Sequence, residues 1–194
     1  FSYLDLDEIA DVKNGNTLSV EELFEIFSGK EKDGEVKAES AFLQNTPILL
    51  EKMASSERFR KCRAGGYVNE ILFRKAQQFS AVTVELPDGT AYISFRGTDD
   101  TIVGWKEDFN LSNGIVPSHR KALEYLEFNG TYMQSMIRLG GHSKGGNLAM
   151  YTAMQCDDAL QEKILSVYDN DGPGFPEAFF SSEKVEKVLP KVTR

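Results

Sequence analysis

Long hydrophobic runs, cysteine and metal-ligand clusters are all scarce in this sequence. No stretch approaches 18 consecutive apolar residues, which excludes a transmembrane helix. The two cysteines, Cys62 and Cys156, form no metal-binding or disulfide framework, although a single bridge between them stays open. So few cysteines indicate a reducing compartment, and we expect a cytoplasmic protein. We expect no bound metal and no cofactor.

Basic residues are also in the minority. Lysine and arginine number 22 against 30 aspartates and glutamates, so the formal net charge is −8, and no run of basic residues offsets it. Nucleic acids and anionic membrane surfaces carry the same sign of charge and would be repelled on average. We therefore expect neither as a partner. The sequence does not indicate an oligomeric state.

The 194 residues, 41% of them hydrophobic, are enough for one well-buried core. We expect a single domain over residues 1–194. Phe1 stands where a complete chain would carry Met, and residues 187–194 look like the start of a strand. We expect both ends to be cut from a longer chain, so the missing signal peptide says little about location.

The hydrophobic periodicity changes near residue 65. Residues 1–64 look helical, with a Ser19–Glu22 capping box and a second helix start at Thr46-Pro47. Residues 65–194 form the predicted sheet core. Strands are expected at 67–73, 80–86, 90–95, 136–139 and 164–168, and helices at 121–126, 144–154 and 176–189. Alternating strands and helices predict an α/β fold with a mostly parallel sheet and helices on both faces.

One motif carries a chemical signal. Gly141-His142-Ser143-Lys144-Gly145 matches G-x-S-x-G, after an apolar run and before a helix. This is the setting of a nucleophile elbow, a strained strand-to-helix turn that exposes a serine hydroxyl. Ser143 is then the nucleophile, and the Lys144 N–H at the helix start can donate to an oxyanion. The alternative is a glycine-rich turn without catalytic role.

A second signal precedes it. Ser94-Phe95-Arg96-Gly97-Thr98-Asp99-Asp100 ends a predicted strand and is followed by Trp105 and Asp108. The second oxyanion donor of α/β-hydrolases comes from the loop after an early strand, where Thr98 offers an N–H and a hydroxyl. By spacing alone, an ordinary polar turn with Trp105 in the core is the better interpretation.

Phe95–Thr98, Trp105, Asp108 and Gly141–Gly146 together resemble class 3 lipases. More closely, the segments Phe95–Asp99, Gly141–Ala149 and Asn170–Phe175 resemble a bacterial α/β-hydrolase domain family of unknown function that is usually grouped with putative lipases. The resemblance covers roughly residues 65–191. It implies an α/β-hydrolase fold and a Ser-His-Asp serine hydrolase. It also implies that Thr98 is an oxyanion donor and that residues 99–111, with Trp105, form a lid.

The triad acid has two candidates in the chain. In this fold the acid and then the histidine follow the nucleophile. Asp169 and Asp171 come directly after the predicted strand 164–168, and we favour Asp171 because it opens the Gly-Pro-Gly turn. Asp171 could instead cap this turn through its side chain. In class 3 lipases the acid follows the next strand, which would place it beyond Arg194.

The triad base is missing from the expected place. His142 lies inside the elbow, and His119 precedes the serine and looks like a surface or capping residue. Either the triad histidine lies beyond Arg194, which we favour, or the fold is an inactive relative.

The sequence thus predicts a serine hydrolase of the lipase or esterase type, acting on a small-molecule ester or lipid. A non-catalytic binding or interaction module is the first alternative. A thioesterase or peptidase on the same fold is the second, because the motifs do not separate acyl groups.

Overall fold

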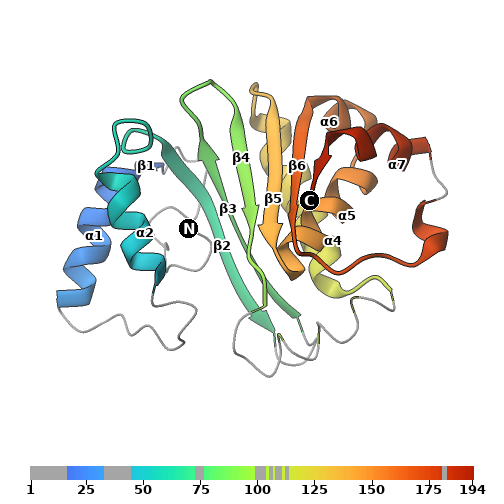
Figure 1. The fold of residues 1–194 in the computed structure, drawn as a ribbon, viewed down its shortest axis with the longest axis horizontal. Coiled ribbons are helices and arrows are strands. Elements are labelled where there is room, and N and C mark those ends of the chain that lie inside the picture. The colour runs from blue at the N-terminus through green and yellow to red at the C-terminus, as the bar shows by residue number, and fades with distance from the viewer. Residues whose placement is uncertain are drawn as a thin grey trace.

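The computed structural model describes residues 17–32, 45–72, 77–98, 104, 107, 111, 114–180 and 183–194. They form one seven-stranded sheet in which the strands lie side by side in chain order (Figure 1). The strands are β1 (Leu18–Ser19), β2 (Arg63–Leu72), β3 (Gln77–Glu85), β4 (Ala91–Phe95), β5 (Ile137–His142), β6 (Ile164–Asn170) and β7 (Val192–Thr193).

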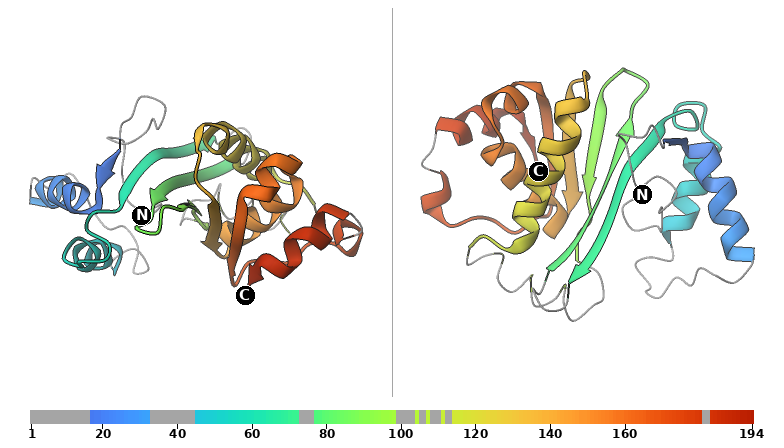
Figure 2. Two further views of the ribbon diagram at one scale, coloured as in Figure 1. Left: turned by 90° about the horizontal axis from the view of Figure 1, so that it is seen from above. Right: turned by 180° about the vertical axis from the view of Figure 1, so that it is seen from behind.

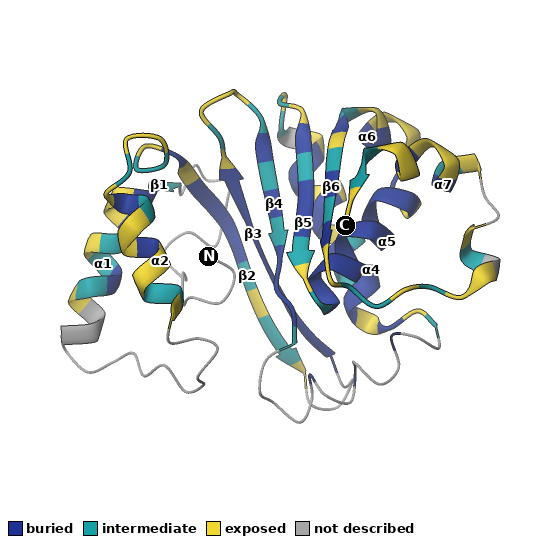
Figure 3. Cartoon of the chain, viewed as in Figure 1, coloured by how far each residue is buried: buried dark blue, intermediate teal, exposed yellow. Residues whose placement is uncertain are grey.

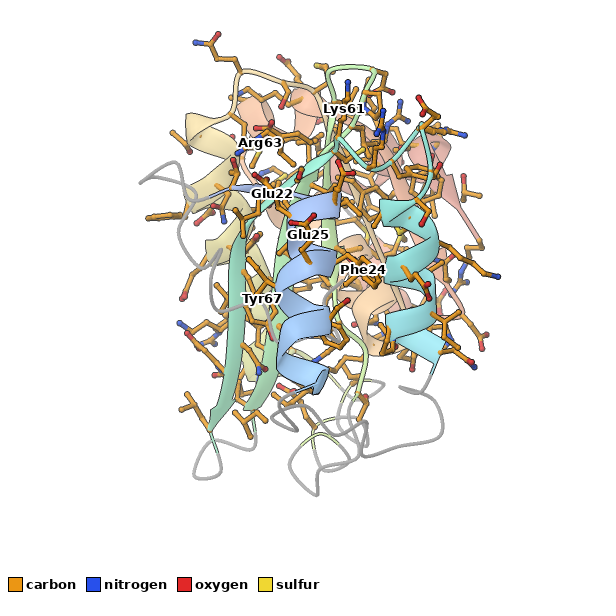
Figure 4. The ribbon with its side chains drawn as sticks, turned by 90° about the vertical axis from the view of Figure 1, so that its left-hand side faces the viewer. Glu22, Phe24, Glu25, Lys61, Arg63 and Tyr67 are labelled. Atoms are coloured by element: carbon orange, nitrogen blue, oxygen red, sulfur yellow. The ribbon has the colours of Figure 1, made fainter. Side chains whose placement is uncertain are left out.

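Two helices precede the long strands, α1 (Val20–Lys32) and α2 (Asn45–Ala54). The predicted capping box of α1 is confirmed: the Glu22 N–H donates to the Ser19 hydroxyl at 3.1 Å, and the Ser19 N–H donates to the Glu22 carboxylate at 2.7 Å. Figure 4 shows the two helices side by side, with α1 between β2 and α2 in this view, Glu22 near Arg63 and Phe24 extending towards α2. The short β1 was not expected within this helical segment.

The first half of the sheet is antiparallel. Strands β1 to β4 pair antiparallel in succession, and β4 to β7 pair parallel. The expectation of a mostly parallel sheet therefore applies only to its C-terminal half. Short connections such as residues 86–90 allow only antiparallel neighbours, whereas a parallel pair needs a crossover long enough to return to the same edge.

The crossovers of the parallel half are helical. They contain α4 (Pro117–Tyr132), α5 (Lys144–Gln155), α6 (Asp158–Lys163), the 3-10 turns η3 (Glu177–Phe180) and η4 (Leu189–Lys191), and α7 (Glu183–Val188). The predicted helix 176–189 is thus split into η3 and α7. The described residues form an α/β structure, as predicted.

Hydrophobic clusters cover both faces of β3. Phe79 and Ala81 belong to the larger cluster beneath α4 and α5, and Val82 and Val84 belong to the smaller cluster with α1 and α2. Because alternate side chains of a strand point to opposite faces, the helix pairs lie on opposite faces of β3. Figure 2 shows α4 and α5 together behind the sheet, and Figure 3 shows β3 buried along nearly its whole length.

Among the described residues, none of the helices combines the length and apolarity that a membrane span requires. Cys62 and Cys156 are both buried and unbridged.

Candidate active site

Ser143 lies in the turn between β5 and α5, at the carboxyl edge of the sheet. Its backbone has φ 55° and ψ −125°, a conformation that residues with a Cβ rarely adopt. The Ser143 N–H donates to the Asn170 carbonyl at 2.9 Å, which holds the turn against β6. The side chain makes no capping hydrogen bond to α5. The strained turn therefore presents a hydroxyl that the helix does not use.

Two glycines let this turn lie against β4. A Cβ on Gly145 would come 2.2 Å from the Phe95 carbonyl oxygen, and one on Gly141 would come 2.5 Å from the same atom. Real Cβ atoms do not approach backbone so closely, so both positions require glycine. This contact brings the two sequence motifs together, because Phe95-Arg96 and the Ser143 elbow touch directly.

The segment after β4 is fixed by its arginine. The Arg96 N–H donates to the Ser80 carbonyl at 2.9 Å, and the Arg96 guanidinium donates to the Asn69 side chain at 2.8 Å. Thr98 follows two residues later at the same edge of the sheet. Its Oγ1 is buried and has no hydrogen-bond partner among the described residues. Thr98 thus has a buried hydroxyl that no described residue uses, three positions after Phe95, which contacts the elbow.

Lys144 is the first residue of α5, where backbone N–H groups point out of the helix end. Its side chain is fully buried, and Nζ lies 3.1 Å from the Glu107 carboxylate. The backbone of Lys144 therefore belongs to the turn, whereas its side chain lies in the protein interior.

The two candidate acids lie in different environments. The Asp169 carboxylate is 2% exposed, accepts from the Gly172 N–H at 3.0 Å and pairs with the Arg194 guanidinium at 2.7 Å. Asp171 is exposed, with φ 60°. No hydrogen bond of its side chain is seen within the described ranges. The carboxylate of Asp171 is therefore available to another group, whereas that of Asp169 is engaged.

The expectation of a surface position for His119 is wrong, although its capping role is confirmed. His119 is fully buried at the start of α4. Its Nδ1 accepts from the Val116 N–H at 2.9 Å, so the proton lies on Nε2, which donates to the Asn147 Oδ1 at 2.7 Å. Burial lowers the pKa of His119, because the charged form loses water. With both ring nitrogens occupied, His119 is no base for Ser143.

The predicted lid lies largely outside the described residues, and Trp105 is among those not described. Three residues of the segment are described, Gly104, Glu107 and Leu111, and all three are buried. Their spacing of three and four residues is that of one helix face. These three positions are therefore packed inside the protein, and the rest of the predicted lid lies outside the described residues.

Glu107, Gln78 and Asn147 were missed by the sequence analysis. The available signal was the lysine directly after the candidate nucleophile, on a helix that packs against a sheet. A cation buried at that place requires an acidic partner. Nothing in the sequence shows which acid that is. Within the described ranges, no three His, Cys, Asp or Glu side chains gather as metal ligands.

The described residues bring together a strained, half-buried serine, a helix N-terminus and, on the segment after β4, a buried hydroxyl. Such groups are among those that an acyl-transfer site would use. A family model described as Mbeg1-like matches residues 53–194. No curated protein and no solved structure matches the chain significantly.

Proposed function

The chain belongs to the Mbeg1-like family, and we propose that it is a serine hydrolase of the lipase or esterase type on an α/β-hydrolase fold. The observation that carries the proposal is the backbone of Ser143, φ 55° and ψ −125°, between a parallel strand and a helix N-terminus. A strained conformation at a non-glycine residue persists where the surroundings impose it, and such residues cluster at active sites.

In the proposed reaction, the Ser143 Oγ attacks the ester carbonyl and its proton passes to a histidine base. The carbonyl oxygen becomes an oxyanion that accepts hydrogen bonds from the Lys144 N–H and from Thr98. The C–O bond of the ester then breaks, the alcohol leaves with the proton, and water hydrolyses the acyl-serine. Asp171 is our candidate to orient the histidine, because its carboxylate is exposed and unused among the described residues.

Free buried thiols at Cys62 and Cys156 are consistent with a reducing compartment, and we propose a cytoplasmic location on that ground.

A non-catalytic binding module is the second candidate. It is favoured by one observation: His119 is engaged at both nitrogens, and His142 is an exposed residue of the elbow itself. The described residues thus supply no base for Ser143.

The test uses the full-length protein with a fluorophosphonate probe and a panel of p-nitrophenyl esters. We expect one adduct, located at Ser143 by mass spectrometry, and ester turnover that falls by about 10⁴ or more in Ser143→Ala. Ser55→Ala, at an exposed serine directly after α2, is the matched control and should keep full activity. Unchanged turnover in Ser143→Ala overturns the assignment. Absence of labelling and turnover in the wild type favours the binding module.

The ester panel also separates the acyl-transfer alternatives. Matched thioester and amide substrates with the same acyl group show whether the leaving group is an alcohol, a thiol or an amine. We expect the oxygen ester to have the highest kcat/KM.

A further inference from the structure

The Lys144 side chain has a complete set of acceptors inside the protein. Its Nζ lies 2.7 Å from the Gln78 carbonyl, 2.5 Å from the Gln78 Oε1 and 3.1 Å from the Glu107 Oε2. An ammonium group has three N–H donors, so each has one of these acceptors. The side chains of Lys144 and Glu107 are both 0% exposed. This is a buried, charged pair directly after the proposed nucleophile.

Glu107 is held as completely as Lys144. Its carboxylate accepts from the Gln78 N–H at 3.1 Å, from the Ser118 N–H at 3.0 Å and from the Ser118 hydroxyl at 2.7 and 2.8 Å. The Ser118 hydroxyl also lies 3.0 Å from the Gln78 carbonyl. Four parts of the chain meet here: the segment of Glu107, the start of β3, the start of α4 and the start of α5.

Stability alone does not account for such a pair. Burying two charges costs much of the attraction gained between them, and well-packed apolar residues of similar size often serve stability as well or better. A buried ion pair does, however, impose a geometry, because each ammonium hydrogen and each carboxylate oxygen needs its partner in place.

The geometry points to a positioning role. Lys144 carries the N–H that we propose as an oxyanion donor, and its side chain ties the same residue to β3 and to Glu107. We infer that the Lys144–Glu107 pair fixes the first turn of α5, so that the Lys144 N–H stays aligned with the reacting carbonyl oxygen. This positioning role rests on the proposed function. Displacement of a catalytic donor by about 1 Å can cost a factor of about 100 in rate.

The test replaces both charges by apolar residues of similar length. Lys144→Met and Glu107→Leu each leave the other charge buried without its partner, and each should lower the melting temperature strongly. The double variant removes both charges and should regain most of that loss. We expect kcat of the double variant to stay at least tenfold below the wild type with KM nearly unchanged, because alignment is lost while the substrate surface remains.

Two further variants make this result interpretable. Lys187→Met with Glu183→Leu removes an exposed ion pair on α7 and should leave kcat unchanged. Glu107→Gln keeps the size of the side chain and serves if the double variant does not fold; its kcat should fall with KM unchanged. Recovery of both stability and kcat in the double variant, or wild-type kcat in Glu107→Gln, overturns the inference.

Hydrogen exchange separates this inference from the proposed function. If the wild type is neither labelled at Ser143 nor active, the proposed function fails. Hydrogen exchange of the amides of residues 143–147 still tests whether the Lys144–Glu107 pair fixes the first turn of α5. We expect these amides to exchange at least tenfold faster in the double variant or in Glu107→Gln, with residues 164–170 of β6 unchanged as internal reference. If these amides exchange at the same rate in the variants as in the wild type, the Lys144–Glu107 pair does not fix the first turn of α5.

Discussion

Gly145 lies so close to Phe95 that a methyl group on it would come within 2.2 Å of the Phe95 carbonyl oxygen. The obstructing atom is backbone and cannot rotate away. Gly145→Ala must therefore separate the elbow from β4 or distort it. We expect a loss of about 1–3 kcal/mol in the free energy of unfolding, as for other overpacked sites, together with loss of Ser143 labelling.

Gly29→Ala is the matched control. Gly29 lies in α1, and a Cβ there would meet no atom within 4 Å. Alanine is the better helix former by about 0.5–1 kcal/mol, so this variant should be slightly more stable than the wild type. Urea denaturation of both variants gives the comparison. A neutral Gly145→Ala would contradict the close approach.

The strain at Ser143 predicts a separation of stability from activity. Residues held at such backbone angles cost about 1–3 kcal/mol, and glycine adopts positive φ freely. We expect Ser143→Gly to be about 1 kcal/mol more stable than Ser143→Ala, with both variants inactive. Thermal denaturation of the two variants checks this. Equal stability, or a less stable glycine variant, would argue against a strained elbow.

The acid assignment can be tested by two matched amides. Asp171→Asn alters an exposed side chain and should leave the melting temperature unchanged while kcat falls by about 10²–10⁴, because the histidine loses its orienting carboxylate. Asp169→Asn breaks the pair with Arg194 and should lower the melting temperature. Full activity in Asp171→Asn would place the acid elsewhere.

His119 predicts a pH dependence of stability. Its ordinary pKa is 6.5, and burial lowers the pKa in the folded protein; the Asn147 hydrogen bond and Glu107 oppose this decrease, whereas Lys144 adds to it. The unfolded chain therefore binds a proton that the folded protein does not. The stabilising contribution is complete above pH 6.5 and is lost as the pH falls towards the lowered pKa.

The loss should not exceed about 1.4 kcal/mol per pH unit for this one group. Urea denaturation between pH 7.5 and 5 measures it. We expect His119→Gln to flatten this slope and His142→Gln, at the exposed histidine, to retain it. A slope that persists unchanged in His119→Gln would refute the role of the buried ring.

The burial of Glu107 within the predicted lid predicts the absence of interfacial activation. Movement of Glu107 away from Lys144 would leave a buried charge unpaired, at a cost of about 3–5 kcal/mol. We expect the full-length protein to hydrolyse a short-chain p-nitrophenyl ester with simple saturation, and no jump in rate where the ester passes its solubility limit. A severalfold increase in the hydrolysis rate at that limit would instead support a moving lid.

The sequence predicted what local patterns determine. The Ser19–Glu22 capping box, most strands and the strand–turn–helix around Ser143 are set by neighbouring residues, and they were predicted within a few residues. The relative direction of neighbouring strands was harder to predict, because it depends on the length and path of the connection between them. The expectation of parallel pairing was wrong for β1 to β4, whose connections include short turns.

Pairings between distant residues could not be predicted. The partners Lys144 and Glu107 are separated by 37 positions, and Lys144 and Gln78 by 66. The sequence shows one charged residue among many at each place, and only the fold determines which of them meet in the interior. For the same reason, His119 looked like a surface residue although it is fully buried against Asn147.

The change from antiparallel to parallel pairing at β4 has a consequence for the order of folding. β3 and β4 are joined by residues 86–90 only, whereas β4 and β5 are joined through residues 96–136. Short loops close sooner and at lower entropic cost than long ones. We expect the β3–β4 hairpin to form early and the β4–β5 pairing late. The carboxyl end of β4 would then already be in place when the strained Ser143 turn forms against it.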